Sequence, residues 1–509
     1  MSDGAGRHAP DTRIDFALLI AILAVAAGLR LVRIDSGIPF ALGIDEPELL
    51  VRAVRMMQSG DFNPHFFDYP RLPIYLHLFV AIGRFLAGAM SHEFRELAKV
   101  DFTDFVLWSR MATAAMGVAT VYVTYRIGQH WGRWHALLAA ALLAVVPMHV
   151  REARFALTDT PMTLCVAGAL WATIVAHERA TTRAFAIAAA AAGLALGVKY
   201  TAGLVILLPL LAVWSSSAHL RVKLQRSLVV GAVWAFTFLL VAPYTVIDLP
   251  GFLNGFATLM SAYRPRALPE APWITYLKHL RIAFGWPGVV ALALGLVLAA
   301  QHVVRGPART RWLLLAVFPV IYFVVISRQD LVYARYLMPI LPAVCVMLAS
   351  AVVASIDILR RFMPPRAVLA VAVVLGAAVL VPPATTSATI LRLASRTSTQ
   401  AEAYQWLLTN LPPGTPVVIE KFEVRLSGSR YRPMYLTRLI EKTYDEHVRS
   451  GARYMVATSQ MYGLALSRPE QDPVRYREYT TLFSQVREVA RFTPSADRPG
   501  PELIIFALP

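Results

Sequence analysis

Long apolar runs, separated by short polar links, make up the first three quarters of the chain. A helix needs about 20 consecutive apolar residues to cross the hydrocarbon core of a bilayer. The runs therefore predict an all-α polytopic membrane domain over residues 1–383, with about 11–13 transmembrane helices plus juxtamembrane helices. Eleven spans are predicted, at roughly 14–34, 104–126, 134–150, 159–177, 184–198, 201–215, 227–243, 286–303, 312–327, 336–356 and 367–383.

Basic residues collect in five of the links between these runs. Because cytoplasmic loops are enriched in Lys and Arg, the links predict a cytoplasmic N-terminus and an external C-terminal tail. Arg30 and Arg33, at the outer end of the first span, disagree with this orientation, but five concordant links outweigh one discordant end. The links contain Arg126 with Arg133, Arg179 with Arg183, Arg221 with Lys223 and Arg226, Arg305 with Arg309 and Arg311, and Arg360 with Arg361 and Arg366.

The apolar segment at 72–90 does not fit the count of spans. If it crossed the membrane, Asp45 and Asp159 would lie on opposite faces, so we predict a juxtamembrane or re-entrant helix within a first external loop of about residues 35–103. In the same loop, apolar residues alternate with Arg52 and Arg55 over residues 46–58. This pattern predicts an interfacial helix.

The pattern changes after residue 383. Residues 401–408 read as an amphipathic helix, and 416–419, 454–457 and 503–506 read as short buried strands. We therefore predict a small, soluble α/β domain over residues 384–509, outside the membrane. A structural cap or an interaction module is favoured for it over a direct catalytic role.

Composition agrees with a membrane protein. The 509 residues are 57% hydrophobic and 16% charged, and the mean hydropathy is +0.53. A net charge of +17 would suggest nucleic-acid binding in a soluble chain, but here the basic links account for most of it. The two cysteines, Cys165 and Cys345, lie far apart in apolar runs and support neither a disulfide framework nor a cysteine metal site.

Candidate chemistry gathers on the predicted outer face. Asp45 and Glu46 follow the first span, and Asp159 follows the third. A carboxylate beside a bilayer is costly, so carboxylates at these positions indicate a functional site. Asp45 is the better candidate for a base that accepts a proton from a nucleophile. A lipid phosphate would be held by cations. The predicted phosphate-binding residues are Lys199, Arg335, Arg264 and Arg266, and the predicted substrate-binding residues are His65, Tyr69, Arg154, Tyr200 and Tyr336.

Each of these residues has a structural alternative. Glu46 could favour the N-terminus of the interfacial helix through its dipole. Asp159 could cap the helix that begins near Pro161, and Lys199 could extend to the interface without a ligand. His65 and His77 lack a spacing that specifies a metal site. The scheme requires no cofactor, although carboxylates could hold a divalent ion.

Five segments in this order resemble the membrane-embedded GT-C glycosyltransferases. The chain is similar in particular to bacterial relatives of dolichyl-phosphate-mannose protein mannosyltransferases and of undecaprenyl-phosphate aminoarabinose transferases, over about residues 14–345. The segments are Asp-Glu at 45–46, Tyr-Pro-x-Leu-Pro-Ile-Tyr at 69–75, Arg-x-Ala-Arg-Phe-Ala-Leu-Thr-Asp-Thr-Pro at 151–161, Gly-Val-Lys-Tyr-Thr at 197–201 and Arg-Tyr-Leu-Met-Pro-Ile-Leu-Pro at 335–342.

The resemblance implies a polyprenyl-phosphate-sugar donor, an external active site and inversion at the anomeric carbon. By position, Asp45 matches the acid that activates the acceptor, Glu46 its partner, Asp159 the second-loop acid and Lys199 the cation near the donor phosphate; Arg335 is a weaker match. Many relatives have His-Pro-Pro or Lys-Pro-Pro where this chain has Tyr-Pro-Arg at 69–71. The tail also lacks the repeats of the eukaryotic protein mannosyltransferases, so a protein acceptor is not favoured over a glycolipid.

The resulting hypothesis is an inverting glycosyltransferase of a bacterial inner or plasma membrane. Its predicted partners are a polyprenyl-phosphate-linked sugar, a lipid, glycan or protein acceptor and membrane lipids, and not nucleic acid. The main alternative is a transporter or flippase for polyprenyl-phosphate sugars or lipids, although transporters usually place polar groups near the bilayer midplane. A non-catalytic glycan-binding scaffold is a third hypothesis.

Overall fold

The computed structural model describes residues 12–38, 43, 45–262, 270–306, 308–329, 331–421, 423–426 and 430–509. The chain forms two compact units. The first comprises Met1–Ile34 and Glu48–Ala388, and the second comprises Asp35–Pro47 and Thr389–Pro509. Each unit is described by itself below.

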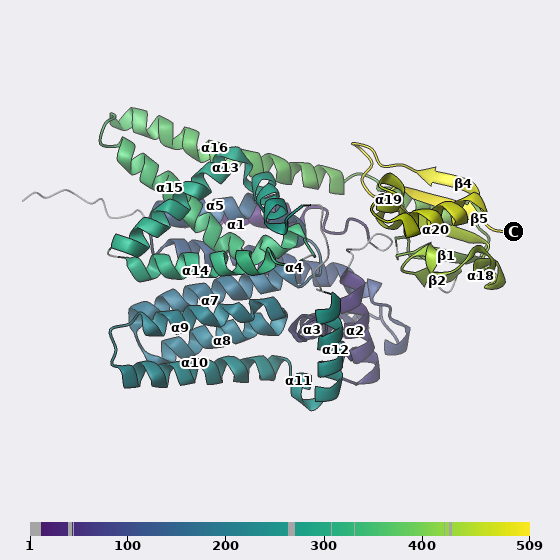
Figure 1. The fold of residues 1–509 in the computed structure, drawn as a ribbon, viewed down its shortest axis with the longest axis horizontal. Coiled ribbons are helices and arrows are strands. Elements are labelled where there is room, and N and C mark those ends of the chain that lie inside the picture. The colour runs from purple at the N-terminus through teal and green to yellow at the C-terminus, as the bar shows by residue number, and fades with distance from the viewer. Residues whose placement is uncertain are drawn as a thin grey trace, which may run out of the picture. The chain divides into compact units, whose positions relative to one another are not determined.

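The first unit is helical (Figure 1). Its elements in chain order, with η marking 3-10 helices, are α1 (Thr12–Leu31), α2 (Glu46–Ser59), α3 (Leu72–Met90), η1 (Leu97–Lys99), α4 (Thr103–Gly128), α5 (Arg133–Val145), α6 (Pro147–Glu152), α7 (Asp159–Arg179), α8 (Thr182–Val198), η2 (Tyr200–Ile206), α9 (Leu207–Trp214), α10 (Leu220–Val241), α11 (Tyr244–Ile247), α12 (Leu249–Ala262), α13 (Pro272–Arg305), α14 (Arg309–Ile326), η3 (Ala334–Ile340), α15 (Leu341–Leu359) and α16 (Pro365–Ala394).

The predicted spans are all helical. Among the described residues, nine helical segments are long and apolar enough to cross a membrane, and three shorter apolar segments lie at 133–145, 182–198 and 200–214. Together these twelve segments account for the eleven predicted spans and for α3. The polytopic all-α fold is therefore confirmed. Whether α3 crosses the bilayer or lies beside it stays a prediction.

Helix α15 forms the centre of the first unit, with most of its side chains buried. It packs against α5 and α13. Close approach to α13 requires Gly295, because a Cβ atom there would lie 2.4 Å from the carbonyl oxygen of Met347. Helix α13 itself bends at Gly285, which has a φ of 67° and precedes Pro287. The sequence pattern predicted only the part of α13 that follows this bend.

Four of the five basic links meet at one end of the bundle. Glu178, at the end of α7, forms an ion pair with Arg311 Nε at 3.1 Å and lies 2.9 Å from His130 Nδ1. Arg226 donates to the carbonyl of Ala180. These contacts join the α4–α5, α7–α8, α9–α10 and α13–α14 connections, so the expected grouping on one side is present in the fold. The cytoplasmic assignment of that side stays a prediction.

Arg30, which disagreed with the charge rule, has a structural role. Its guanidinium is fully buried and donates to the carbonyls of Ala144 at 3.0 Å and Leu143 at 3.2 Å. Pro147 follows these residues and has no N–H to donate to Leu143, so the last carbonyls of α5 need another donor. Arg30 also lies 2.8 Å from His149 Nδ1. It therefore caps α5 and is not a signal of topology.

Two amphipathic helices accompany the bundle. Helix α2 confirms the helix predicted over 46–58, with Leu49 and Ala53 packed against Ile74 and Leu78 of α3 and with Arg55 exposed. Helix α12 runs across the direction of α10 (Figure 1). This change of direction brings one face of α12 onto the residues that follow α8, as described below.

The second unit contains a five-stranded sheet with the order β2-β1-β3-β5-β4. Strands β1, β2 and β3 are mutually parallel, whereas β5 is antiparallel to β3 and β4. Its elements are α17 (Thr399–Asn410), β1 (Pro416–Glu420), β2 (Arg432–Leu436), η4 (Leu439–Glu441), α18 (Tyr444–Arg449), β3 (Tyr454–Thr458), α19 (Ser459–Ser467), α20 (Pro473–Ser484), β4 (Arg487–Phe492) and β5 (Leu503–Ala507).

Side chains alternate between the two faces of the sheet. Val418 and Met455 pack with α19 and α20, whereas Ile419 and Val456 pack with α17 on the other face. The predicted strands are therefore β1, β3 and β5, which are buried on both faces. Strands β2 and β4 have no apolar pattern that predicts them, because these edge strands contain Arg and, in β2, Pro433 in place of an apolar run.

The buried Glu423 makes the stability of the second unit depend on pH. Burial raises its pKa to about 6, although Gln400 donates to its carboxylate at 3.1 Å. An acid with a raised folded-state pKa contributes stability below its unfolded pKa, and the contribution is lost as the pH rises through 6. We expect Glu423→Gln to match the wild type at pH 4.5 and to be more stable at pH 7.5, by about 2 kcal/mol.

Hydrogen exchange of the β1 amides in the full-length protein would measure this difference. Glu478→Gln, on the exposed side of α20, is the control and should give the same protection of the β1 amides as the wild type at pH 4.5 and at pH 7.5. An equal effect of Glu423→Gln on stability at pH 4.5 and at pH 7.5 would contradict a raised pKa for Glu423.

Candidate active site

Asp159 is the first residue of α7 and is buried. Its carboxylate accepts from Lys199 Nζ at 2.8 Å and lies 3.7 Å from Arg335 Nε. The N-cap of α7 is Thr158, so Asp159 is not the capping residue that the alternative interpretation required. Its negative charge still suits the first turn of a helix.

Lys199 follows α8, where the chain becomes extended. The residue is 9% exposed, and its ammonium group lies 4.7 Å from the centre of the Tyr336 ring. The side chain is therefore held inside the protein by a carboxylate and an aromatic ring. This environment does not fit a lysine that only extends to the interface.

Arg335 and two tyrosines complete the cluster. The Arg335 guanidinium lies 4.9 Å from the ring centre of Tyr333, and the rings of Tyr333 and Tyr336 meet edge to face at 5.4 Å. Two cations thus lie beside one carboxylate. Such a cluster can accept an anion, and the aromatic rings can pack against an apolar or sugar face.

The position of the cluster along the helices is informative. Asp159 begins α7 and Glu178, with the basic links, lies near its end. Because α7 has 21 residues, the two sets of charges are separated by about 30 Å. The structure therefore brings Asp159, Lys199, Arg335 and Tyr336 together at the end of the bundle opposite the basic links, as the topology argument expected.

Tyr200 belongs to a neighbouring aromatic cluster. Its hydroxyl donates to the carbonyl of Phe67 at 3.1 Å, and its ring packs on Phe252 and Phe256 of α12. Gly255 permits this approach, since a Cβ atom there would lie 2.7 Å from Phe67. The aromatic cluster fixes the first loop and α12 to the turn that contains Lys199.

Arg71 was not among the predicted site residues, yet it is fully buried in this region. Its guanidinium lies 4.1 Å from the Phe67 ring and donates to Thr245 Oγ1 at 3.0 Å. The Nε and Nη2 groups have no hydrogen-bond partner among the described residues. The signal in the sequence was a basic residue in the Tyr-Pro-Arg segment at 69–71.

Three other predicted substrate residues lie elsewhere. His65 is exposed and its Nε2 lies 2.9 Å from Asp61, whose pKa is lowered by the backbone N–H of Asn63 and by His65. Tyr69 packs against Phe66. Arg154 donates to the carbonyl of Arg33 at 2.7 Å, a contact that joins the α6–α7 connection to the end of α1. Their substrate roles stay predictions.

Asp45 and Glu46 belong to the second compact unit. Asp45 is half-buried in the turn before α2. The Glu46 carboxylate is buried and accepts from the backbone N–H of Gly43 at 2.7 Å, which supports the structural alternative for this residue.

Arg264 and Arg266 lie outside the described residues. Within the part of the chain that the structure describes, no group of three or more His, Cys, Asp or Glu is arranged to hold a metal ion.

Comparisons with known proteins agree with this architecture. A family profile described as dolichyl-phosphate-mannose-protein mannosyltransferase matches residues 101–247, which include Asp159 and Lys199. The structure of ArnT from Cupriavidus metallidurans in the apo state matches with a TM-score of 0.56 and 16% identity, covering 97% of each chain. This likeness shows that the chain has the same fold as ArnT. The resemblance seen in the sequence is thereby confirmed.

Two further structures match this chain. One is ArnT from C. metallidurans bound to undecaprenyl phosphate, with 15% identity, a TM-score of 0.52 and coverage of 97% of each chain. The other is the Archaeoglobus fulgidus oligosaccharyltransferase in the apo form, with 13% identity and a TM-score of 0.59, covering 90% of this chain and 71% of that one. A search of curated protein sequences finds no match.

The ion cluster of Asp159, Lys199 and Arg335 should be important for stability. Removing one member of a buried pair leaves an uncompensated charge, at a cost of about 3–5 kcal/mol. We expect Asp159→Asn to lower stability more than Lys199→Met, because Arg335 still faces Asp159 in the second variant. The double variant should lose less than the sum of the two.

Thermal unfolding in detergent, analysed as a double-mutant cycle, would measure this coupling. The exposed pair Arg360 and Asp357 provides a matched control, and its substitutions should have small and additive effects. Additive effects at Asp159 and Lys199 would show that the pair does not contribute to the fold.

Proposed function

We propose that the protein is an inverting glycosyltransferase, which moves a sugar from a polyprenyl-phosphate donor to a glycolipid, glycan or protein acceptor on the outer face of a bacterial inner or plasma membrane. The observation that carries this proposal is the cluster of Asp159, Lys199 and Arg335 with Tyr336. It places two cations and an aromatic ring beside one carboxylate at one end of a helical bundle. The same fold in ArnT was solved bound to undecaprenyl phosphate.

Lys199 and Arg335 hold the donor phosphate in this proposal. Both cations face Asp159 in the structure, so the carboxylate keeps them oriented until a phosphate takes over part of their charge. The same cations stabilise the negative charge that develops on the phosphate as it leaves. Asp159 is therefore a positioning residue, and the hydrocarbon tail of the donor lies along the membrane helices.

Asp45 is the proposed base. Its carboxylate accepts the proton of the acceptor hydroxyl or amine, whose oxygen or nitrogen attacks the anomeric carbon from the side opposite the phosphate. The bond from the anomeric carbon to the phosphate oxygen breaks as the new bond forms, so the configuration inverts. Polyprenyl phosphate leaves with the electron pair of the broken bond.

Substitution of Asp45 tests the base. Asp45→Asn should lower the transfer rate by roughly 10²–10⁴-fold, because the amide cannot accept the proton, and binding of polyprenyl phosphate should not change. Glu46→Gln is the matched control and should retain most activity, because its side-chain oxygen can still accept from Gly43. Transfer at the wild-type rate by Asp45→Asn would overturn this assignment.

Substitution of Lys199 tests the phosphate site. Lys199→Met should weaken binding of polyprenyl phosphate by roughly 10–100-fold, since a hydrogen bond to a charged group contributes about 1.5–3 kcal/mol. Lys223→Met, in the basic links at the other end of the bundle, is the control. Binding would be measured by native mass spectrometry in detergent.

A transfer assay in proteoliposomes separates the enzyme from the rival transporter. An enzyme converts a labelled polyprenyl-phosphate sugar into polyprenyl phosphate and a labelled acceptor. A transporter moves the intact donor between the leaflets and leaves the glycosidic bond in place. Movement of the donor without cleavage would overturn the proposed activity.

A further inference from the structure

A small cavity opens in the second unit near the carboxyl ends of its parallel strands. It has a volume of about 110 Å³. Arg438 comes two residues after β2 and Gln460 two residues after β3. Because parallel strands end at the same edge of a sheet, ligands of α/β domains commonly bind there. The cavity is lined by Arg438, Gln460, Met461, Leu464, Ala465, Asp472 and Arg475.

Buried Glu420, the last residue of β1, holds the segments that surround this cavity. One carboxylate oxygen accepts from the backbone N–H of Leu439 at 2.9 Å and from the hydroxyl of Tyr479 in α20 at 2.7 Å. The other accepts from the backbone N–H of Thr458, just before α19, at 2.8 Å. One carboxylate therefore links all three segments, from η4, α19 and α20, that form the cavity wall.

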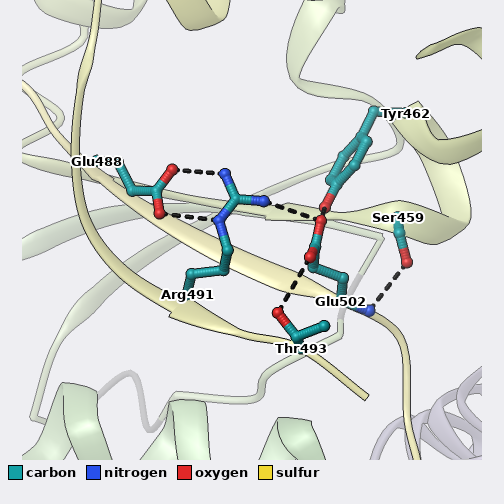
Figure 2. Close-up of polar contacts among 6 residues, drawn as sticks. All are labelled: Ser459, Tyr462, Glu488, Arg491, Thr493 and Glu502. Carbon is teal, nitrogen blue, oxygen red and sulfur yellow. Dashed lines mark hydrogen bonds and ion pairs between the residues drawn. The ribbon is translucent and has the colours of Figure 1, made fainter. Parts of the chain in front are cut away.

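A second network fixes α19 itself (Figure 2). The Glu502 carboxylate accepts from Tyr462 at 2.7 Å, Arg491 at 3.0 Å and Thr493 at 3.2 Å, and its backbone N–H donates to Ser459 Oγ at 2.9 Å. Ser459 and Tyr462 belong to the first turn of α19. The wall that carries Gln460 and Met461 is thus formed before a ligand binds, which lowers the entropic cost of binding.

The side chains that line the cavity include two arginines and one carboxylate. Arg475 pairs with Asp472 at 3.2 Å at the start of α20. No salt bridge joins the guanidinium of Arg438 to a carboxylate within the described parts of the chain. Arg438 lines the cavity and is only half-exposed. Its charge acts on the buried carboxylate of Glu420, which already accepts three hydrogen bonds, so the guanidinium can accept an anionic ligand without breaking an ion pair.

The remaining lining suits a sugar ring. Leu464, Ala465 and Met461 offer an apolar surface for the C–H face of a pyranose. The Gln460 amide and the Asp472 carboxylate offer the donors and acceptors that ring hydroxyls require. A simple inorganic anion would use the guanidinium and leave the apolar surface without a partner.

We propose that this cavity binds a monosaccharide unit that carries a carboxylate or a phosphate. The negative group pairs with Arg438, the ring lies on Met461 and Leu464, and the hydroxyls bond to Gln460 and Asp472. This site goes beyond the proposed transfer reaction, because none of the residues that line it has a role in that reaction and its occupancy can be measured by binding alone. A free anionic sugar and an anionic residue of a longer glycan present the same chemistry to it.

Binding can be followed on the full-length protein in detergent through its methionine methyl groups. The Met461 methyl signal, labelled with ¹³C and assigned with Met461→Leu, reports on the cavity, and Met116 in α4 serves as an internal reference. Glucuronic acid is the probe, with glucose as its neutral counterpart and inorganic phosphate as an anion without a ring. A glucuronate-containing oligosaccharide distinguishes a glycan from a free sugar.

We expect glucuronic acid to shift the Met461 signal saturably and to leave Met116 unchanged. Glucose should bind at least tenfold more weakly. Arg438→Gln should lower the affinity for glucuronic acid at least tenfold, while Arg477→Gln, an exposed arginine on α20, should not. The backbone N–H of Arg438 bonds to Glu441, so this capping contact survives the substitution.

Three results would overturn the proposal. The Met461 signal could stay unchanged with glucuronic acid, the Arg438→Gln variant could bind it as tightly as the wild type, or inorganic phosphate could bind as tightly as glucuronic acid. Loss of sugar transfer in Asp45→Asn with glucuronic acid binding retained would support the two sites as separate functions. Retained transfer in that variant would refute Asp45 as the base. The glucuronic acid titration of the wild type and of Arg438→Gln would still support or overturn the cavity proposal.

Discussion

Buried charge must be compensated within the protein, and this constraint organises the first unit. Asp159 and Lys199 lie 40 residues apart, yet a 2.8 Å contact joins the start of α7 to the end of α8. Arg335 brings η3 to the same carboxylate. In a low-dielectric interior none of these charges is stable alone, so the contacts that maintain the fold also assemble two cations beside aromatic rings. Structure and proposed chemistry thus depend on one interaction.

The same constraint explains polar residues that look misplaced in the sequence. Arg30 supplies donors to the last carbonyls of α5, which Pro147 leaves unsatisfied. Glu420 plays the corresponding part in the second unit, where it accepts three hydrogen bonds that hold the segments around the sheet edge. In both units a buried charged side chain satisfies backbone groups at the ends of regular elements and orients the neighbouring segments.

The two proposed sites use different recognition chemistry. The cluster around Lys199 offers compact cations to a phosphate whose tail is apolar, and its rings lie beside the charges. The cavity beside Arg438 offers one guanidinium, an amide and an apolar surface, which together suit a charged sugar ring. The residues of the Lys199 cluster belong to the first compact unit, and the residues that line the cavity belong to the second. Donor phosphate and charged saccharide are therefore assigned to different units.

Periodicity and charge along the chain were sufficient to predict the eleven spans, the helix at α2 and the three inner strands, because each depends on a local apolar pattern. They also indicated Asp159, Lys199 and Arg335 as residues of one face. The sequence could not show that these three share one ion cluster, that Arg30 caps α5, or that Arg71 is buried, since such contacts join distant segments. Edge strands β2 and β4 were missed for the same reason: pairing with neighbouring strands, and not an apolar pattern of their own, makes them strands.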